Sequence, residues 1–135
     1  MDQVNVLTQQ GITYFQHSQS QAVGVDVKGL SILAGVPLAV IVRLLDSLLG
    51  ISDTPVPATL KRLEGKVFNK SVAVIPRTAV VDSTAAIDIL EYFAFENRQY
   101  RNQQALSAYC DFKTIGLRDR ITYMIRRLKA EAKGG

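Results

Sequence analysis

Residues 26–48 constrain the fold most strongly, because a single glycine separates two short helical periodicities in this segment. Asp26 suits the start of the first helix, since its carboxylate can accept hydrogen bonds from the unpaired N–H groups of the first turn. Gly35 suits the end of that helix, because glycine adopts positive φ without strain. Pro37 suits the first turn of the next helix, where its missing N–H does no harm. The segment therefore predicts two short helices joined by a tight turn.

The side chains around this turn predict how the two helices meet. Ser31 and Ala34 give the first helix a small face, which lets a second helix cross it closely. Val36 supplies an apolar plug after the turn, and Ile41 and Leu44 are the inward residues of the second helix. This combination is typical of a helix-turn-helix unit. In such a unit the second helix can project from the surface into the major groove of DNA.

Short strands are predicted on both sides of these helices. Loosely alternating apolar residues over residues 4–15, with a turn at residues 9–11, predict a hairpin that decorates the unit like a wing. Residues 67–68 and 71–75 predict a second pair of strands. Residues 77–81 are expected to form an extended linker to the rest of the chain.

Helical periodicity dominates the remainder of the sequence. The spacing predicts helices over residues 82–96, 97–114 and 117–129, with Gly116 breaking the second from the third. Seven of the ten aromatic residues lie in this part, and at helical spacing we expect them to be mainly core residues.

The predicted fold class is therefore α+β and mostly helical. A helix-turn-helix unit with short β-hairpins would occupy residues 1–80, and a three-helix C-terminal oligomerisation unit would occupy residues 81–135. The two parts could also form one compact domain, since 135 residues can bury a hydrophobic core without disulfides or metals.

Composition excludes several classes of function. The single cysteine, Cys110, rules out an internal disulfide framework and a multi-cysteine zinc site, and we expect it to be a buried, inert thiol. The single histidine, His17, rules out the usual histidine triads and clusters. The sequence holds no glycine-rich phosphate-binding loop. We therefore expect no enzymatic activity, no metal and no small-molecule cofactor.

The expected compartment is the cytoplasm. The most apolar stretch, residues 30–42, is interrupted by Pro37 and falls short of the roughly 20 residues that a membrane span needs. The N-terminus lacks the basic start and the apolar run of a targeting segment. We therefore expect no membrane partner.

Positive charge is concentrated near the C-terminus. Residues 113–135 hold seven basic and two acidic residues, so this stretch carries +5 and the rest of the chain −1. Such asymmetry suggests an anionic partner, although a solvated helix face is the alternative interpretation. The candidate DNA-binding residues outside the second helix of the predicted unit are Lys28, Arg118, Arg120, Arg126, Arg127 and Lys129.

The outward positions of that second helix test the DNA interpretation. They are Leu38, Ala39, Val42, Arg43 and Asp46. Arg43 is the only one that reads guanine well, while the apolar side chains could at most touch a thymine methyl group. Asp46 would be repelled by phosphate, and it lies three residues from Arg43, where the two could pair. An apolar outer face is more naturally buried against protein.

Two segments carry a resemblance to known proteins. Residues 27–36, Val-Lys-Gly-Leu-Ser-Ile-Leu-Ala-Gly-Val, resemble the "xxRGLAxLAGV" start of phage antirepressor-type and related small bacterial helix-turn-helix proteins. Residues 89–96 and 112–117 are similar to the C-terminal part of uncharacterised cyanobacterial proteins that share such a start. The resemblance spans residues 23–127. It implies DNA-linked regulation on a plasmid or phage-like element and assigns little chemistry.

Two hypotheses follow from the sequence. The first is a small, cytoplasmic, non-enzymatic regulator that binds duplex DNA as a homodimer or higher homo-oligomer. The alternative is a helical oligomerisation or protein-interaction module whose helix-turn-helix does not read DNA. The basic C-terminal stretch and the resemblance favour the first, and the apolar outer face of the second helix favours the alternative. A further group, the carboxylates Asp88 and Glu91 on one helix face, is expected to be solvated.

Overall fold

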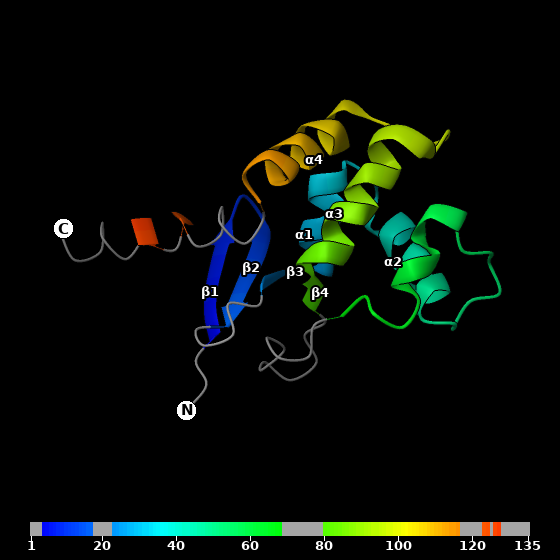
Figure 1. Cartoon of the computed structure of the whole chain (residues 1–135), viewed down its shortest axis with the longest axis horizontal. Helices are drawn as coiled ribbons and strands as arrows, with labels where there is room; N and C mark the ends of the chain where they lie inside the picture. The colour runs from blue at the N-terminus through cyan, green and yellow to red at the C-terminus, as the bar shows by residue number, and fades with distance from the viewer. Residues whose placement is uncertain (1–3, 18–22, 69–79, 117–122, 125, 128–135) are drawn as a thin grey trace.

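The chain folds as an antiparallel sheet with helices packed beside it (Figure 1), in a computed structural model that describes residues 4–17, 23–68, 80–116, 123–124 and 126–127. The strands, in the spatial order β1-β2-β3-β4, are Val4–Gln9, Ile12–His17, Val23–Asp26 and Val80–Asp82. The helices are α1 (Val27–Ala34), α2 (Leu38–Leu48), the 3-10 helix η1 (Ala58–Leu63), α3 (Ser83–Glu91), the π-helix η2 (Tyr92–Glu96) and α4 (Gln103–Ile115). The expected α+β, mostly helical class is confirmed.

The predicted N-terminal hairpin is confirmed, with a turn set by two residues. Strands β1 and β2 pair from Gln9 opposite Ile12 outward. Between them Gln10 and Gly11 both have positive φ, 55° and 81°. This is the geometry of two-residue turns whose twist matches that of the flanking strands. Strand β2 continues to His17, beyond the predicted end of the hairpin.

Two further strands extend the sheet where the sequence predicted none. Strand β3 pairs with β2, and β4 pairs with β3, with Val25 opposite Val81. Residues 80 and 81, expected in an extended linker, are thus hydrogen-bonded within the sheet. Phe68 forms an isolated bridge with Val81, and its predicted partners at residues 71–75 lie outside the described part of the chain. The sheet therefore joins residues on both sides of the boundary expected at residue 80.

Helices α1 and α2 begin and end close to the predicted positions. Asp26 caps α1 by accepting a hydrogen bond from the Gly29 N–H at 3.0 Å, and its carboxylate also accepts from the Thr13 N–H of β2 at 3.0 Å. Gly35 ends α1 with φ 66°. Pro37 immediately precedes α2, and the two helix axes are bent by 116°.

The interior of this helix pair is the predicted one. Ser31, Ala34, Val36 and Ile41 are buried, and Leu44 is half-buried. Helix α1 lies at the centre of the molecule, because it contacts β2, β3, α2, α3 and α4. One hydrophobic core therefore includes residues from the sheet and from every helix named above, with Phe93 and Ala94 contributed by η2.

The C-terminal helices differ from the prediction at their boundaries. Asp82 caps α3 as expected, but after Glu91 the helix continues as the π-helix η2. Helix α4 begins at Gln103, six residues later than predicted, because residues 97–101 form a turn that the Arg101 N–H closes on the Asn97 carbonyl at 3.0 Å. Most of the predicted helix at residues 117–129 lies outside the described residues. The part of it that is described, residues 123–124 and 126–127, is helical.

The expected burial of the C-terminal side chains is only partly correct. Phe93 and Phe112 are buried, whereas Phe95 is 51% exposed and meets Tyr109 edge to face at 5.6 Å. Cys110 is exposed, so the prediction of a buried thiol is wrong. It lies on the outer face of α4, which helical periodicity alone did not reveal. No single helix in the described part is long and apolar enough to cross a membrane, while α1 and α2 together pass that test only as a sharply bent pair.

Candidate nucleic-acid interface

Helix α2 presents the outward face that the sequence predicted. Ala39 and Arg43 are exposed, and Leu38 and Val42 retain 45% and 41% of their accessible surface. Asp46 is only half-buried. The opposite face is held in the core by buried branched residues, Ile41, Leu45 and Leu48. These contacts fix the helix while the four candidate DNA-binding side chains, Leu38, Ala39, Val42 and Arg43, remain accessible.

The turn before α2 is anchored by Asn102, a residue that the sequence analysis did not single out. The Asn102 amide nitrogen donates to the carbonyl oxygens of Ala34 at 2.7 Å and Tyr100 at 2.8 Å. Its oxygen accepts from the Ala105 N–H at 2.9 Å and so caps α4. A β-carbon on Gly35 would lie 2.5 Å from that oxygen, so the turn fits closely against the start of α4.

A second basic segment lies beside α2. The turn at residues 97–101 shares a groove with this helix, and the groove is lined by Arg43 on one side and by Asn97, Gln99 and Tyr100 on the other. Arg98 and Arg101 of the same turn are exposed. Arginine interleaved with an aromatic ring suits nucleic acid. The sequence could not place this turn next to α2, because residues 49–96 lie between them.

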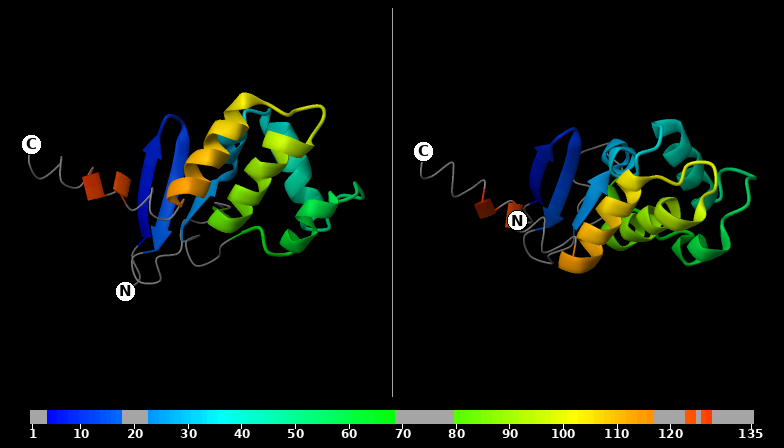
Figure 2. Two further views of the ribbon diagram at one scale, coloured as in Figure 1. Left: turned by 45° about the horizontal axis from the view of Figure 1, so that its top comes forward. Right: turned by 90° about the horizontal axis from the view of Figure 1, so that it is seen from above.

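The other candidate residues do not join this face. Lys28 is exposed on the first turn of α1, at the end remote from the turn that leads to α2. Arg126 and Arg127 are exposed and belong to a segment beside the hairpin, at the opposite end of the molecule from α2 in Figures 1 and 2. The hairpin therefore does not flank α2 as a wing would. Arg118, Arg120 and Lys129 lie outside the described residues.

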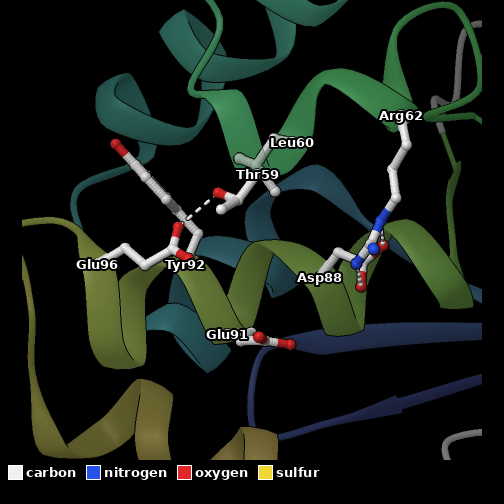
Figure 3. Close-up of a pocket in the computed structure, with 7 residues that line it drawn as sticks. All are labelled: Thr59, Leu60, Arg62, Asp88, Glu91, Tyr92 and Glu96. Atoms are coloured by element: carbon white, nitrogen blue, oxygen red, sulfur yellow. Dashed lines mark hydrogen bonds and ion pairs between the residues drawn. The ribbon is translucent and has the colours of Figure 1, made fainter.

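A separate acidic pocket lies between η1 and the helix formed by α3 and η2 (Figure 3). Arg62 donates to both carboxylate oxygens of Asp88, at 2.7 and 3.2 Å, and Thr59 donates to Glu96. The Asp88 carboxylate raises the pKa of the Arg62 guanidinium above its ordinary value through this hydrogen bond and its charge. The expectation of a solvated acidic face is therefore wrong for Asp88, whose side chain is 12% exposed.

These contacts have a structural consequence. The Arg62–Asp88 and Thr59–Glu96 contacts hold η1 against the helix formed by α3 and η2 at the surface. Leu60 and Leu63 of η1 are buried beneath them in the core. Among the residues that the structure describes, no group of three His, Cys, Asp or Glu side chains could hold a metal ion.

Comparison with known proteins adds no relative. No protein-family model matches the chain, and neither a curated protein nor a solved structure is significantly similar to it. The resemblance of residues 27–36 to antirepressor-type proteins stays a hypothesis.

Proposed function

We propose that the protein is a small, non-enzymatic regulator that binds duplex DNA, with α1, the turn and α2 acting as a helix-turn-helix unit. The observation that carries the proposal is the 116° bend between the two helices across a three-residue turn. Helix-turn-helix units join their helices at about 90–120° through a turn of about three or four residues that often contains glycine. The exposed face of α2 is available for a groove of DNA.

The chemistry of this face assigns a role to each accessible side chain. Arg43 would donate two parallel hydrogen bonds to a guanine edge in the major groove. Ala39 and Val42 would lie against thymine methyl groups. Arg98 and Arg101, on the turn that shares a groove with α2, would contact phosphates and orient the helix. A homodimer would place two such helices on adjacent half-sites.

Substitution of Arg43 tests this assignment directly. Duplexes that bind the protein are first enriched from a randomised pool and then titrated with the full chain. We expect Arg43→Gln to weaken binding to the enriched duplex by about 1–3 kcal/mol and to relax the preference at one base pair. The matched control, Lys61→Gln, removes an equal charge from an exposed site on η1 and should change affinity little. Equal affinity of the Arg43 variant and the parent would contradict the assignment.

A second candidate function, a protein-interaction module, is favoured by the apolar character of the same face. Leu38 and Val42 are exposed there, and two more large apolar residues just after the end of α2, Leu49 and Ile51, are also exposed. Such a surface is more typical of a protein interface than of a DNA contact. An oligomer of this chain or a complex with another protein would cover it.

Leu38→Asp separates the two candidates. Because Leu38 is exposed in the folded chain, the single chain of the variant should fold in either case. A DNA-binding helix would then lose duplex affinity, since a carboxylate would face phosphates, while sedimentation would show an unchanged oligomer. An interaction module would instead lose its assembly, because the carboxylate would be buried unpaired at a cost of about 2–5 kcal/mol. The DNA proposal would be rejected if the variant loses its assembly and the parent protein shows no affinity for duplex DNA.

A further inference from the structure

The groove between α2 and the turn at residues 97–101 is a small pocket on the surface, distinct from the acidic pocket of Figure 3. It has a volume of about 180 Å³, and the loop at residues 54–57 closes its third side. In another protein a cavity of about 150 Å³ accommodates a benzene molecule. The groove therefore has room for one ring.

The charge of the groove indicates the sign of the charge on a ligand that would bind there. Among the residues that the structure describes, Arg43 is the only ionised one that lines the groove, and the other polar side chains there are amides and hydroxyls. The acidic pocket of Figure 3 is different, because Asp88, Glu91 and Glu96 outnumber its single arginine. A guanidinium binds a carboxylate through two parallel hydrogen bonds, so the groove favours a carboxylate.

The walls of the groove define the shape of a ligand. Pro55, Pro57 and Leu44 line the groove with apolar side chains, and the half-buried Tyr92 and Tyr100 line it with aromatic ones. Gln99 adds an exposed amide. Flat proline and aromatic surfaces suit a planar apolar body. Ligand sites in proteins commonly combine such walls with a small number of polar groups that fix orientation.

The far wall of the groove is held in place before any ligand arrives. The Asn97 amide donates to the Tyr92 hydroxyl at 3.0 Å, and the Asn97 oxygen accepts from the Tyr100 N–H at 2.7 Å. Tyr92 begins the π-helix η2, and π-helical turns occur frequently at functional sites. A preorganised wall lowers the entropic cost of binding.

We propose that this groove binds a small planar carboxylate that acts as an effector of the protein. The bound carboxylate would engage the Arg43 guanidinium, which is the side chain assigned above to guanine. Effector and duplex would therefore compete for one group, and each would weaken the binding of the other. The regulatory part of this inference rests on the proposed DNA-binding function, whereas the binding site does not.

Calorimetric titration of the full chain with benzoate, and with neutral benzamide as the matched control, tests the site without DNA. We expect benzoate to bind with one-to-one stoichiometry and benzamide to bind about tenfold more weakly or not at all. Arg43→Gln should reduce the benzoate affinity by about tenfold, and Lys61→Gln, which removes an equal charge from η1 outside the groove, should not. Absence of benzoate binding, or equal binding by the Arg43→Gln variant, would overturn the site.

Substitutions at Thr54 test the position of the ligand and its effect on DNA. Thr54 lines the groove and is exposed, so Thr54→Tyr should fill the groove and remove benzoate binding, while Thr54→Ala should preserve it. Saturating benzoate should weaken duplex binding of the parent by about fivefold or more and leave Thr54→Tyr unaffected. Benzoate binding in a protein without duplex affinity would support the site and reject the proposed function. Duplex binding in a protein that ignores benzoate would do the reverse.

Discussion

At the scale of single residues, Asn102 connects parts of the molecule that the sequence leaves unrelated. Its side chain caps α4 through the Ala105 N–H and also holds the carbonyl of Ala34, 68 residues earlier, at the end of α1. Because Gly35 follows directly, Asn102 determines where the turn into α2 lies. The orientation of the candidate DNA-binding helix therefore depends on a residue outside that helix.

Two substitutions of Asn102 separate capping from anchoring. Asn102→Ala removes both the cap and the donor to Ala34, so we expect it to lower the free energy of unfolding by about 1–3 kcal/mol in denaturant titrations. Asn102→Ser keeps an oxygen that can cap α4, but this side chain is too short to reach the Ala34 carbonyl as well. We therefore expect it to lower the free energy of unfolding by less than Asn102→Ala does. Equal stability of the alanine variant and the parent would show that neither contact contributes.

Local signals at single residues were readable from the sequence, and long-range ones were not. Asp26 and Gly35 were predicted because a cap and a left-handed turn are determined by neighbouring backbone. Asn102 was missed because its decisive partner is distant in the chain. Cys110 was misplaced for a related reason, since its exposure depends on which face of α4 the rest of the fold covers.

At the scale of elements, the central strands were hardest to predict. Strands β3 and β4 have only four and three residues, and all but the last residue of each is buried, so they are too short to show the alternation that marks a half-exposed strand. The hairpin was predicted because its strands adjoin a recognisable turn. The pairing of β3 with β4 spans more than 50 residues of sequence and leaves no local signature.

Gly24 makes that pairing possible and offers a test of it. A β-carbon at Gly24 would lie 2.5 Å from Cγ1 of Val80 and 2.6 Å from the carbonyl oxygen of Val81. We expect Gly24→Ala to lower the free energy of unfolding by about 1–3 kcal/mol, because the strands must separate to admit the methyl group. Hydrogen exchange should accelerate in β3 and β4 and change less at the β1–β2 turn. Unchanged exchange in β4 would contradict the close approach.

At the scale of the whole molecule, the fold divides the predicted DNA-binding residues between two ends. Helix α2 and the turn at residues 97–101 lie at one end, and the segment with Arg126 and Arg127 lies beside the hairpin at the other (Figure 2). The sequence predicted which side chains of α2 face outward, because helical periodicity determines that. It could not predict which basic segments share a surface, since that depends on packing across the entire chain.

The salt dependence of duplex binding reports which end contacts phosphate. Each phosphate neutralised by a cation steepens the slope of log affinity against log salt by about 0.9. If α2 is the DNA-contacting helix, the double variant Arg98→Ala/Arg101→Ala should make the slope shallower by about two, because both residues are exposed on the adjoining turn. Arg126→Ala/Arg127→Ala is the matched control, with the same loss of charge at the opposite end, and should leave the slope unchanged. The reverse result would place DNA against the hairpin and C-terminal segment, and α2 would then have to be assigned to protein contacts.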